Sequence, residues 1–336
     1  MRTIVGAVAA LLVCHSAFAQ RAEAPPTPTD VKPGSITCED IPYPSEVSYM
    51  PLKLYGQDLR LAYMDVPAQG TPNGRTVMLF HGMNFAGFYW GGPIEALRKE
   101  GYRVVVPDQI GFGRSSKAVM PYNFHDMARN SKLLLDHLKI SKAAVIGHSM
   151  GGMLAARFAT QYPAIAEQVV IYNPIGVTDG RFNRPWGSID EAYERNLRTT
   201  YQNIYAGIFR YFSHNPSVWK PEFEKYVRYR YAWTLSGDWP RYAMVQSLIQ
   251  QITYLDPVVN DWANIKSPTL VFGGAEDTAA GSPKLYQERM KFIADSIPDR
   301  KGRLHLLPGI GHVPHFEAPE KTHPPLIAFL KELKEA

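Results

Sequence analysis

One short segment constrains the fold more than any other: VIGHSMGG at residues 145–152. It places Ser149 between Gly147 and Gly151, which is the G-x-S-x-G pattern of a nucleophile elbow. A serine at such a sharp turn holds a strained backbone, and the positions two before and two after it have little room for a side chain. An apolar strand-like run leads into the turn, and a helical pattern with small residues follows at 152–162. The segment predicts a nucleophilic serine between a buried strand and a helix; the alternative is a Gly- and Ser-rich loop without a chemical role.

The first residues have the pattern of a processing signal. Arg2 gives a positive start, residues 4–13 form a short apolar segment, and AFA at 17–19 fits the small-x-small cleavage pattern. We expect residues 1–19 to be a signal peptide, Gln20 to begin the mature chain, and the protein to be exported, either to a periplasm or as a secreted protein. The apolar segment is too short for a stable anchor, so no membrane insertion is expected after cleavage. An uncleaved anchor is the alternative.

Composition narrows the class of protein further. The chain has 336 residues, of which 45% are hydrophobic and 20% charged, enough to build a large core. The formal net charge of +5 is scattered without basic blocks, so nucleic acid is not an expected partner. Cys38 is the one cysteine left after the signal, so no intrachain disulfide is expected. Residues 20–45 form a Pro-rich extension, and 20–35 predict a disordered or extended tether.

Further along the chain, strand-like runs alternate with helical patterns. We expect strands at 52–55, 59–66, 76–80, 103–107, 143–146, 168–172, 269–273 and 303–307. We expect helices at 93–100, 123–138, 152–162 and 319–334, with Asn123 as the N-cap of the second. The first two strands flank Gly56-Gln57-Asp58, which indicates an antiparallel hairpin turn. The alternation predicts an α/β fold whose mostly parallel sheet is flanked by helices, with the hairpin as an antiparallel edge.

This alternation stops between residues 175 and 265. The region is helical in pattern and rich in tyrosine, tryptophan and phenylalanine. Because strand-like sequence resumes after it, we expect 46–174 and 266–336 to form one α/β core and 175–265 to be an inserted helical cap over the carboxyl edge of the sheet. Most of the aromatic side chains should fill the cap, and a minority should line a pocket.

A serine nucleophile needs partners elsewhere in the chain. The hydroxyl of Ser149 is weakly nucleophilic near neutral pH, so it requires a base, and the base requires an orienting acid. In an open parallel sheet these groups lie on loops at the carboxyl ends of strands. Asp277 follows the expected strand at 269–273, and His312 follows the last expected strand. We therefore predict Ser149, Asp277 and His312 as the catalytic residues, with Glu276 as an alternative acid.

Five segments in this order resemble the signatures of the α/β-hydrolase superfamily, in its capped serine-hydrolase branch. They are His81-Gly82, DQIGFGRS at 108–115, the elbow at 147–152, GAED at 274–277 and GHVPHFEAP at 311–319. The resemblance covers about residues 50–335 and is weakest through the cap. It implies the α/β-hydrolase fold, a Ser-Asp-His triad and an oxyanion hole.

The resemblance also bears on individual roles. It favours Asp277 over Glu276 as the acid, and Asp179 is a second alternative because some relatives carry the acid after the preceding strand. It favours His312 over His315 as the base, since a glycine precedes His312 and an E-x-P pattern follows it.

A tetrahedral intermediate requires two donors facing its oxyanion. Met150, directly after the nucleophile, supplies one backbone N–H at a helix N-terminus. The resemblance implies that Met83 supplies the other, and the side chain of Asn84 could contribute or contact substrate. His148 and His315 are further candidates for the substrate pocket, although His148 is typical of a packing residue in such elbows.

The residue at the elbow also limits the reaction. Relatives that open epoxides or displace halides use an aspartate where this chain has Ser149, so acyl chemistry is favoured. We expect hydrolysis of a small or medium, apolar or aromatic carboxylic ester through an acyl-enzyme. The alternatives are a C–C bond hydrolase or enol-lactonase acting on ring-cleavage products, and a non-catalytic ligand-binding relative. No cofactor or metal is expected, because the H-x-x-H of His312 and His315 is better explained by the triad.

Overall fold

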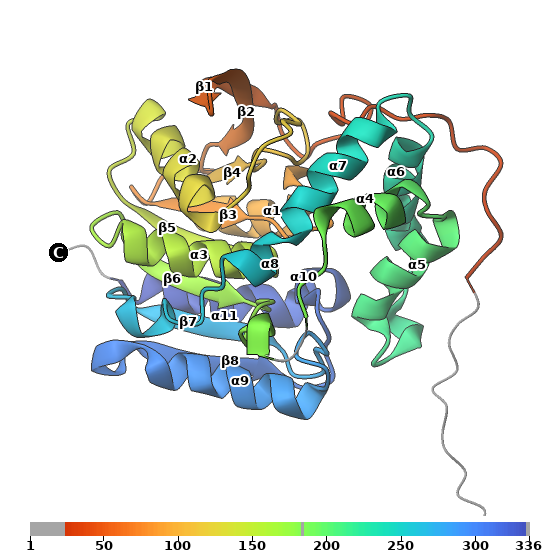
Figure 1. Ribbon diagram of the computed structural model, residues 1–336. Coiled ribbons are helices and arrows are strands. Elements are labelled where there is room, and N and C mark those ends of the chain that lie inside the picture. Colours follow the sequence, from red (N-terminus) through yellow and green to blue (C-terminus); the bar gives the residue numbers. More distant parts are fainter. Residues whose placement is uncertain (1–23, 183–184, 334–336) are drawn as a thin grey trace, which may run out of the picture.

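The computed structural model describes residues 24–182 and 185–333, so the predicted signal peptide lies outside the described residues. An eight-stranded sheet runs through the protein in the order β1-β2-β4-β3-β5-β6-β7-β8 (Figure 1). Its strands are β1 (Ser48–Leu54), β2 (Gln57–Val66), β3 (Thr76–Phe80), β4 (Arg103–Pro107), β5 (Ala143–His148), β6 (Ala166–Tyr172), β7 (Thr269–Gly274) and β8 (Gly302–Leu307). β2 pairs antiparallel with both β1 and β4, and all other neighbours are parallel. The predicted α/β class, with an antiparallel edge on a parallel sheet, is confirmed.

The hairpin turn lies one residue earlier than predicted. Leu54 pairs with Gln57, so the turn residues are Tyr55 and Gly56, and the predicted turn over Gly56-Gln57-Asp58 is wrong. Both turn residues have positive φ, 48° and 74°. A two-residue loop of this kind matches the right-handed twist of the two strands, so it places Gln57 and Asp58 in the ladder.

Helices cover both faces of the sheet. They are α1 (Gly91–Lys99), α2 (Phe124–His137), α3 (Met150–Gln161), α9 (Pro283–Ser296), α10 (Pro314–Glu317) and α11 (Pro319–Lys331). In Figure 1, α2, α3 and α9 lie on one face, and α1 and α11 lie on the other. Two buried clusters correspond to these faces, and β3 contributes Met78 and Phe80 to one and Val77 and Leu79 to the other. A strand buried on both faces reads as a continuous apolar run, which explains why period-two alternation is missing from its sequence.

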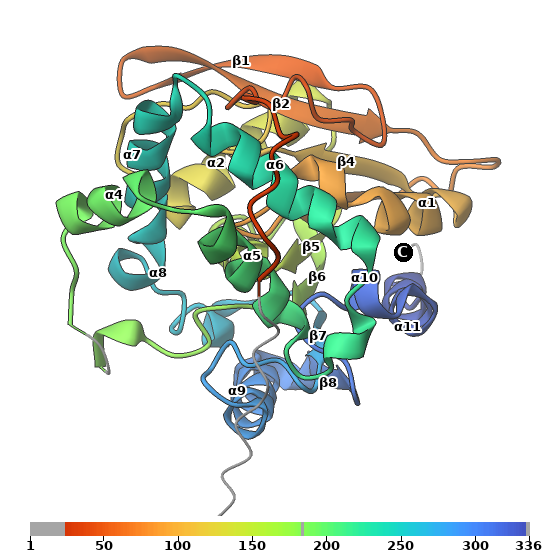
Figure 2. The ribbon, with the colours of Figure 1, turned by 90° about the vertical axis from the view of Figure 1, so that its right-hand side faces the viewer.

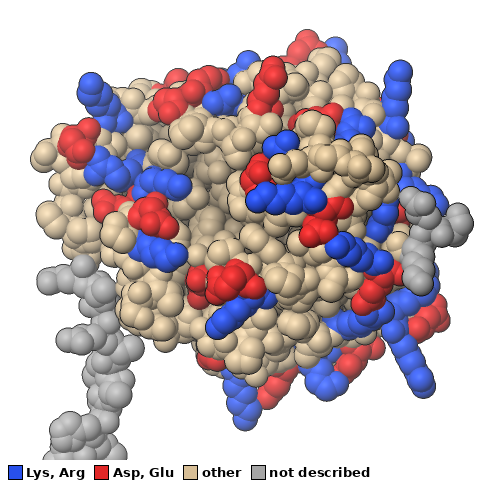
Figure 3. All heavy atoms as spheres, turned by 180° about the vertical axis from the view of Figure 1, so that it is seen from behind, with Lys and Arg blue, Asp and Glu red and all other residues tan. Residues whose placement is uncertain are grey.

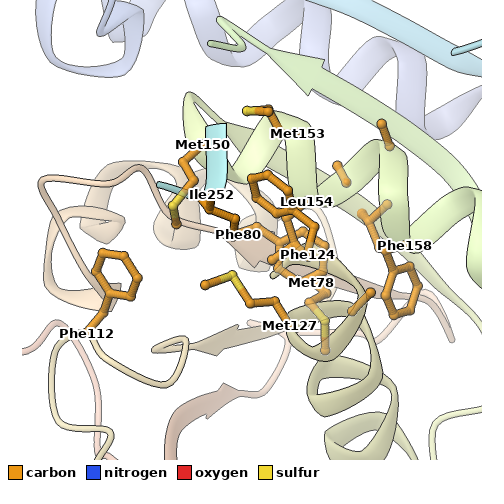
Figure 4. Packing of buried hydrophobic residues seen from close by; sticks show 14 of the residues in the cluster. Met78, Phe80, Phe112, Phe124, Met127, Met150, Met153, Leu154, Phe158 and Ile252 are labelled. Carbon is orange, nitrogen blue, oxygen red and sulfur yellow. The ribbon is translucent and has the colours of Figure 1, made fainter. Parts of the chain in front are cut away.

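Close packing of α3 fixes the position of the elbow. Phe80 on β3 meets Phe158 on α3 with ring centroids 5.8 Å apart, and α2 completes the layer with Phe124 and Met127 (Figure 4). Asn123 caps α2 by accepting a hydrogen bond from the Asp126 amide at 2.7 Å, which confirms the predicted cap.

The segment between β6 and β7 is helical. It contains α4 (Ile189–Leu197), α5 (Tyr201–Phe209), α6 (Glu224–Thr234), α7 (Trp239–Gln250) and α8 (Ile252–Leu255). We call residues 175–265 the insertion. These helices lie beside the end of the sheet at which β5 delivers Ser149 (Figure 1).

The Pro-rich segment is extended and bound rather than free. It crosses the outer side of α5 and α6 (Figure 2). The Gly34 amide donates to the Ala232 carbonyl at 2.9 Å, and Arg228 forms an ion pair with Asp30. Of the two predicted alternatives, the described part is the extended one, and backbone and side-chain bonds tie it to the insertion.

Charged side chains of both signs occur on the surface. On the face drawn in Figure 3, Lys and Arg side chains are interspersed with Asp and Glu, so no single sign of charge dominates that face. Among the described residues, every helix is too short or too polar to cross a bilayer.

Candidate active site

Ser149 occupies a strained turn between β5 and α3. Its φ and ψ are 60° and −118°, outside the usual regions for a residue with a side chain. The turn leaves no space beside it: a Cβ on Gly147 would overlap the Gly151 carbonyl, and one on Gly151 would overlap the Phe80 carbonyl. The two glycines of the elbow therefore have the steric role that the sequence predicted.

The three predicted catalytic side chains form one continuous hydrogen-bond chain. His312 Nε2 lies 3.0 Å from Ser149 Oγ, and His312 Nδ1 lies 2.7 Å from Asp277 Oδ2. A carboxylate can only accept, so Nδ1 carries a proton and donates it to Asp277, and Nε2 is left to accept the serine proton. All three side chains are buried, although they come from distant parts of the chain. The arrangement is that of a nucleophile, a base and an orienting acid.

Asp277 is held by more than His312. Its Oδ2 accepts from Asn173 Nδ2 at 2.7 Å, and its Oδ1 accepts from the Ala279 amide at 2.8 Å. Burial by itself would raise the pKa of Asp277, but the charge of His312 and these hydrogen bonds outweigh burial, so the pKa lies below its ordinary value of 3.8. Asp277 is therefore ionised at neutral pH.

In the described structure, the alternative acids and base do not take the places of Asp277 and His312. Glu276 lines the pocket beside the serine, but the imidazole of His312 bonds to Asp277 instead. Asp179 pairs with Arg181 at 2.6 Å, and that pair holds the pKa of Asp179 below its ordinary value. His315 is buried against Tyr172, whose hydroxyl lies 3.0 Å from His315 Nδ1.

His148 supports the site from behind. Its Nε2 lies 2.8 Å from the carbonyl of His312, which can only accept, so Nε2 carries the proton. Its Nδ1 then accepts from the Tyr89 hydroxyl at 3.0 Å, and that hydroxyl accepts from the Gly82 amide at 3.0 Å. Burial first, and then the nearby His312, lower the pKa of His148 to about 3, so it stays neutral. The chain of bonds joins the Gly82 loop to the backbone that carries the base.

Two of the predicted pocket residues therefore face away from the cavity. His148 and His315 are buried and are not among the residues that line it. The imidazoles fill the space behind the base, where they hold backbone and hydroxyl groups. The third predicted pocket residue, Asn84, does line the cavity together with Met83.

The predicted oxyanion donors both lie near the serine. Met150 is the first residue of α3, directly after Ser149, and Met83 belongs to the loop after β3. The Gly82 amide is held by Tyr89, which fixes the start of that loop. The roles of Met83 and Met150 stay predictions.

A cavity of about 210 Å³ opens beside Ser149. Its walls come from the core loops and from the insertion. The lining residues are Met83, Asn84, Ser149, Ile175, Arg210, Tyr211, Ser213, His214, Glu276, Asp277, Thr278, Ala279 and His312. Most of them are polar, and Tyr211 is the one tyrosine, tryptophan or phenylalanine among them. Most of the other rings of the insertion pack against one another instead, such as Tyr205 against Trp219.

Glu317 braces the loop that carries the base. Its carboxylate accepts from the Gly311 amide at 3.0 Å and from the Val313 amide at 3.4 Å, one residue on each side of His312. The carboxylate also lies 3.0 Å from Nε2 of His214, a residue of the insertion that lines the cavity. Glu317 thus connects the insertion to the backbone of the base.

Sequence reasoning missed several of these residues. Asn173 directly follows β6, so its place at the carboxyl edge of the sheet could have identified it. Tyr211 and His214 carry no such signal, because their contacts are with residues about a hundred positions away. Among the described residues, no group of three or more metal-ligating side chains comes together.

Comparison with known proteins agrees with this fold. The profile described as the alpha/beta hydrolase family matches residues 77–323. A structure from Pseudomonas aeruginosa PAO1, described as a "probable hydrolytic enzyme", is 33% identical, covers 91% of this chain and 99% of its own, and has a TM-score of 0.82. A thermophilic esterase from Thermogutta terrifontis, 22% identical with a TM-score of 0.65, covers 86% of this chain and 99% of its own and shares the fold.

One curated relative matches a smaller part of this chain. A protein of Pantoea ananatis (strain LMG 20103) named "Putative carbamate hydrolase RutD" is 34% identical over 123 residues, which are 36% of this chain and 44% of that protein. The matched part thus spans less than half the length of that relative. The family profile covers most of the chain and the Pseudomonas structure covers nearly all of it, and on these grounds the protein belongs to the alpha/beta hydrolase family.

Proposed function

We propose that this protein is a serine esterase that cleaves a small carboxylic ester through an acyl-enzyme. The observation that carries the proposal is the unbroken hydrogen-bond chain from Asp277 through His312 to Ser149, at 2.7 and 3.0 Å. Each donor in this chain faces an acceptor, so His312 presents Nδ1 to Asp277 and Nε2 to the serine hydroxyl, as proton abstraction requires.

The reaction begins when Ser149 Oγ attacks the ester carbonyl carbon while its proton moves to His312 Nε2. The ionised Asp277 stabilises the imidazolium that forms. The tetrahedral intermediate then collapses, the bond to the alcohol oxygen breaks, and His312 gives its proton to the departing alcohol. Water, deprotonated by the same Nε2, attacks the acyl-enzyme and releases the acid, which regenerates the serine hydroxyl.

Negative charge develops on the former carbonyl oxygen in both halves of the reaction. We assign its stabilisation to the backbone N–H groups of Met83 and Met150, and loss of one such donor typically costs about 3 kcal/mol of barrier. Their support is positional, since both residues lie next to Ser149, one at the start of α3 and one in the cavity wall.

The cavity favours a small substrate with polar atoms. Its volume of about 210 Å³ is below the range of about 300–1,000 Å³ common for drug-sized ligands. Most of its lining residues carry polar groups, although polar and apolar atoms share its surface about equally. The cavity therefore does not specifically support an apolar or aromatic substrate, and the rings that suggested one are largely used in packing the insertion. A carbamate is the second candidate, since the relative from Pantoea bears that name and the same serine would attack a carbamate carbonyl.

A hydrolysis panel tests the proposal. The purified protein is assayed on p-nitrophenyl esters of two to eight carbons, a matched carbamate, an enol-lactone and a vinylogous diketo acid, with Ser149→Ala as the blank. We expect turnover that is highest for short acyl groups and lost in the variant. Selective cleavage of the diketo acid or the enol-lactone would instead support the alternative predicted from sequence. Hydrolysis that persists in Ser149→Ala would contradict the serine mechanism.

We also propose that residues 1–19 direct export to a periplasm or to the medium. The basis is the positive start, the short apolar segment and the AFA motif in the sequence. N-terminal sequencing of the protein recovered from cell fractions should begin at Gln20 outside the cytoplasm. An intact Met1 on cytoplasmic protein would contradict this proposal.

A further inference from the structure

Three polar side chains link the insertion to the wall of the cavity. Arg230 on α6 donates from Nη1 to Asn84 Oδ1 at 2.8 Å and lies 3.5 Å from the Asn84 carbonyl oxygen. Asn84 Nδ2 in turn bonds to the hydroxyl of Tyr211. Asn84 and Tyr211 line the cavity with Ser149, so the chain of bonds ends beside the proposed nucleophile.

The chemistry of the three groups fixes the direction of every bond. A guanidinium has donors and no acceptor, so the Asn84 atom that faces Arg230 must be the oxygen. The amide nitrogen is then the atom that faces Tyr211, and the tyrosine oxygen must accept. Within residues 24–182 and 185–333, Asn84 is the hydrogen-bond partner of the Tyr211 hydroxyl. Because the tyrosine oxygen accepts in that bond, the hydroxyl proton is not used in it.

The surroundings keep that proton in place and near the reaction. Burial raises the pKa of Tyr211, although the Asn84 bond and the nearby Arg230 oppose the rise, so the hydroxyl remains a donor at neutral pH. The Tyr211 ring lies against His312, with ring centroids 4.7 Å apart. A substrate whose carbonyl carbon reached Ser149 would therefore share the cavity with an O–H group that has no acceptor among the described residues.

We propose that Tyr211 is a specificity-determining residue, whose hydroxyl donates to an oxygen of the substrate next to the scissile ester. The substrate class is an ester with an ether, hydroxyl or keto oxygen close to the reacting carbonyl. Asn84 and Arg230 are positioning residues. Arg230 fixes the orientation of the Asn84 amide, and the Asn84 amide donates to the Tyr211 oxygen, so the hydroxyl proton of Tyr211 points to the cavity. The inference rests on the proposed esterase function and deepens it.

The test compares esters that differ by one atom. In the acyl arm, p-nitrophenyl methoxyacetate is compared with p-nitrophenyl butanoate; in the alcohol arm, 2-methoxyethyl acetate is compared with butyl acetate. In each pair, an oxygen replaces a methylene. For each ester, kcat/KM of the wild-type protein is divided by kcat/KM of Tyr211→Phe, which cancels the intrinsic reactivity of that ester. We expect Tyr211→Phe to lower kcat/KM about tenfold for the oxygen-bearing ester of one arm, which is the scale of one lost hydrogen bond, and less than twofold for its isostere.

Further variants separate positioning from packing. Arg230→Met should reduce the same preference by a similar factor, and adding it to Tyr211→Phe should cause little further loss, since both changes break one chain of bonds. Arg230→Lys should restore part of the preference, because an ammonium also fixes the Asn84 oxygen. Tyr205→Phe, which removes a hydroxyl from a ring packed against Trp219, is the matched control and should leave both arms unchanged.

The outcomes distinguish this inference from the function on which it rests. Equal loss for both esters of a pair, in both arms, would overturn the role of Tyr211 while leaving the esterase proposal intact. Additive losses for Arg230→Met and Tyr211→Phe would overturn the positioning role of Arg230. Failure of the wild-type protein to cleave any of the four esters would overturn both proposals together.

Discussion

Replacement of Asp277 by asparagine tests the site with a change of one atom and almost no change of shape. In the wild-type protein, Oδ2 of Asp277 accepts from both His312 and Asn173, and Oδ1 accepts from the Ala279 amide. An asparagine can present its oxygen to only one of these two sides. The effect on kcat depends on whether the oxygen faces the Ala279 amide or the side chains of His312 and Asn173.

The structure favours the orientation in which the oxygen of the new asparagine faces the Ala279 amide. If the new NH2 group faced the Ala279 amide, two donors would oppose each other, at a cost of about 1–3 kcal/mol for the unpaired group. If it faces His312 and Asn173 instead, His312 Nδ1 can become an acceptor. Asn173 Nδ2 also has the Gly311 carbonyl 3.4 Å away as a second partner. The second orientation is therefore the less costly one, and it moves the imidazole proton to Nε2.

A proton on Nε2 prevents His312 from accepting the proton of Ser149. We expect Asp277→Asn to reduce kcat by about 10⁴, equivalent to about 5.4 kcal/mol of barrier, while the folded structure persists. Burst-phase kinetics with an activated ester and circular dichroism measure the two effects separately. Asp179→Asn is the matched control and should leave kcat nearly unchanged, because that carboxylate pairs with Arg181 away from the base.

Two results would refute this reasoning. A loss of less than tenfold in Asp277→Asn would mean that the carboxylate does not set the histidine tautomer. A larger loss in Asp179→Asn than in Asp277→Asn would transfer the role of acid to the loop after β6.

Three other predictions concern the elbow and the histidines. Ser149→Ala and His312→Ala should each remove about a millionfold of kcat, and the double variant should be scarcely worse than either; additive losses would mean that one residue is misassigned. Gly151→Ala should lower the free energy of unfolding by about 3 kcal/mol, because its Cβ would overlap the Phe80 carbonyl, and an unchanged urea midpoint would argue against the tight turn. The pKa of His148 is lowered from 6.5 to about 3, so the unfolded chain binds more protons between these pH values and stability falls as the solution is acidified. His148→Gln should therefore flatten the pH dependence of unfolding between pH 4 and 6 by about 1.4 kcal/mol per unit, and equal slopes in the two proteins would contradict the buried neutral imidazole.

Much of the core was predictable because local chemistry and global fold agree there. The strands β3 and β4 have the predicted bounds. A short continuous apolar run is typical of a strand that is buried on both faces, which is a strand in the middle of a sheet. Asn123 caps its helix as predicted, because capping depends on neighbours three residues away. The hairpin turn was placed one residue late, since Gly56 fits either turn and register is fixed by the pairing of whole strands.

The cavity was less predictable because its walls meet only after folding. The sequence predicted that most aromatic side chains fill the insertion and a minority line a pocket, and ring–ring packing inside the insertion agrees with the first part. It did not identify Tyr211 as the ring that lines the cavity. The contact of Tyr211 with His312 joins residues from the insertion and the last loop, and no spacing in the sequence encodes it. His148 stands beside the nucleophile in sequence, yet the elbow turns it away from the cavity to bond the backbone of the base.

The most direct test of the account is covalent labelling of the serine. The folded protein is treated with a fluorophosphonate, and the modified peptide is identified by mass spectrometry. We predict one label, on Ser149, whose rate of formation falls by several orders of magnitude in His312→Ala, because the hydroxyl then lacks the base 3.0 Å away. An unlabelled Ser149, or a labelling rate that is the same without His312, would contradict the claim that this histidine activates this serine.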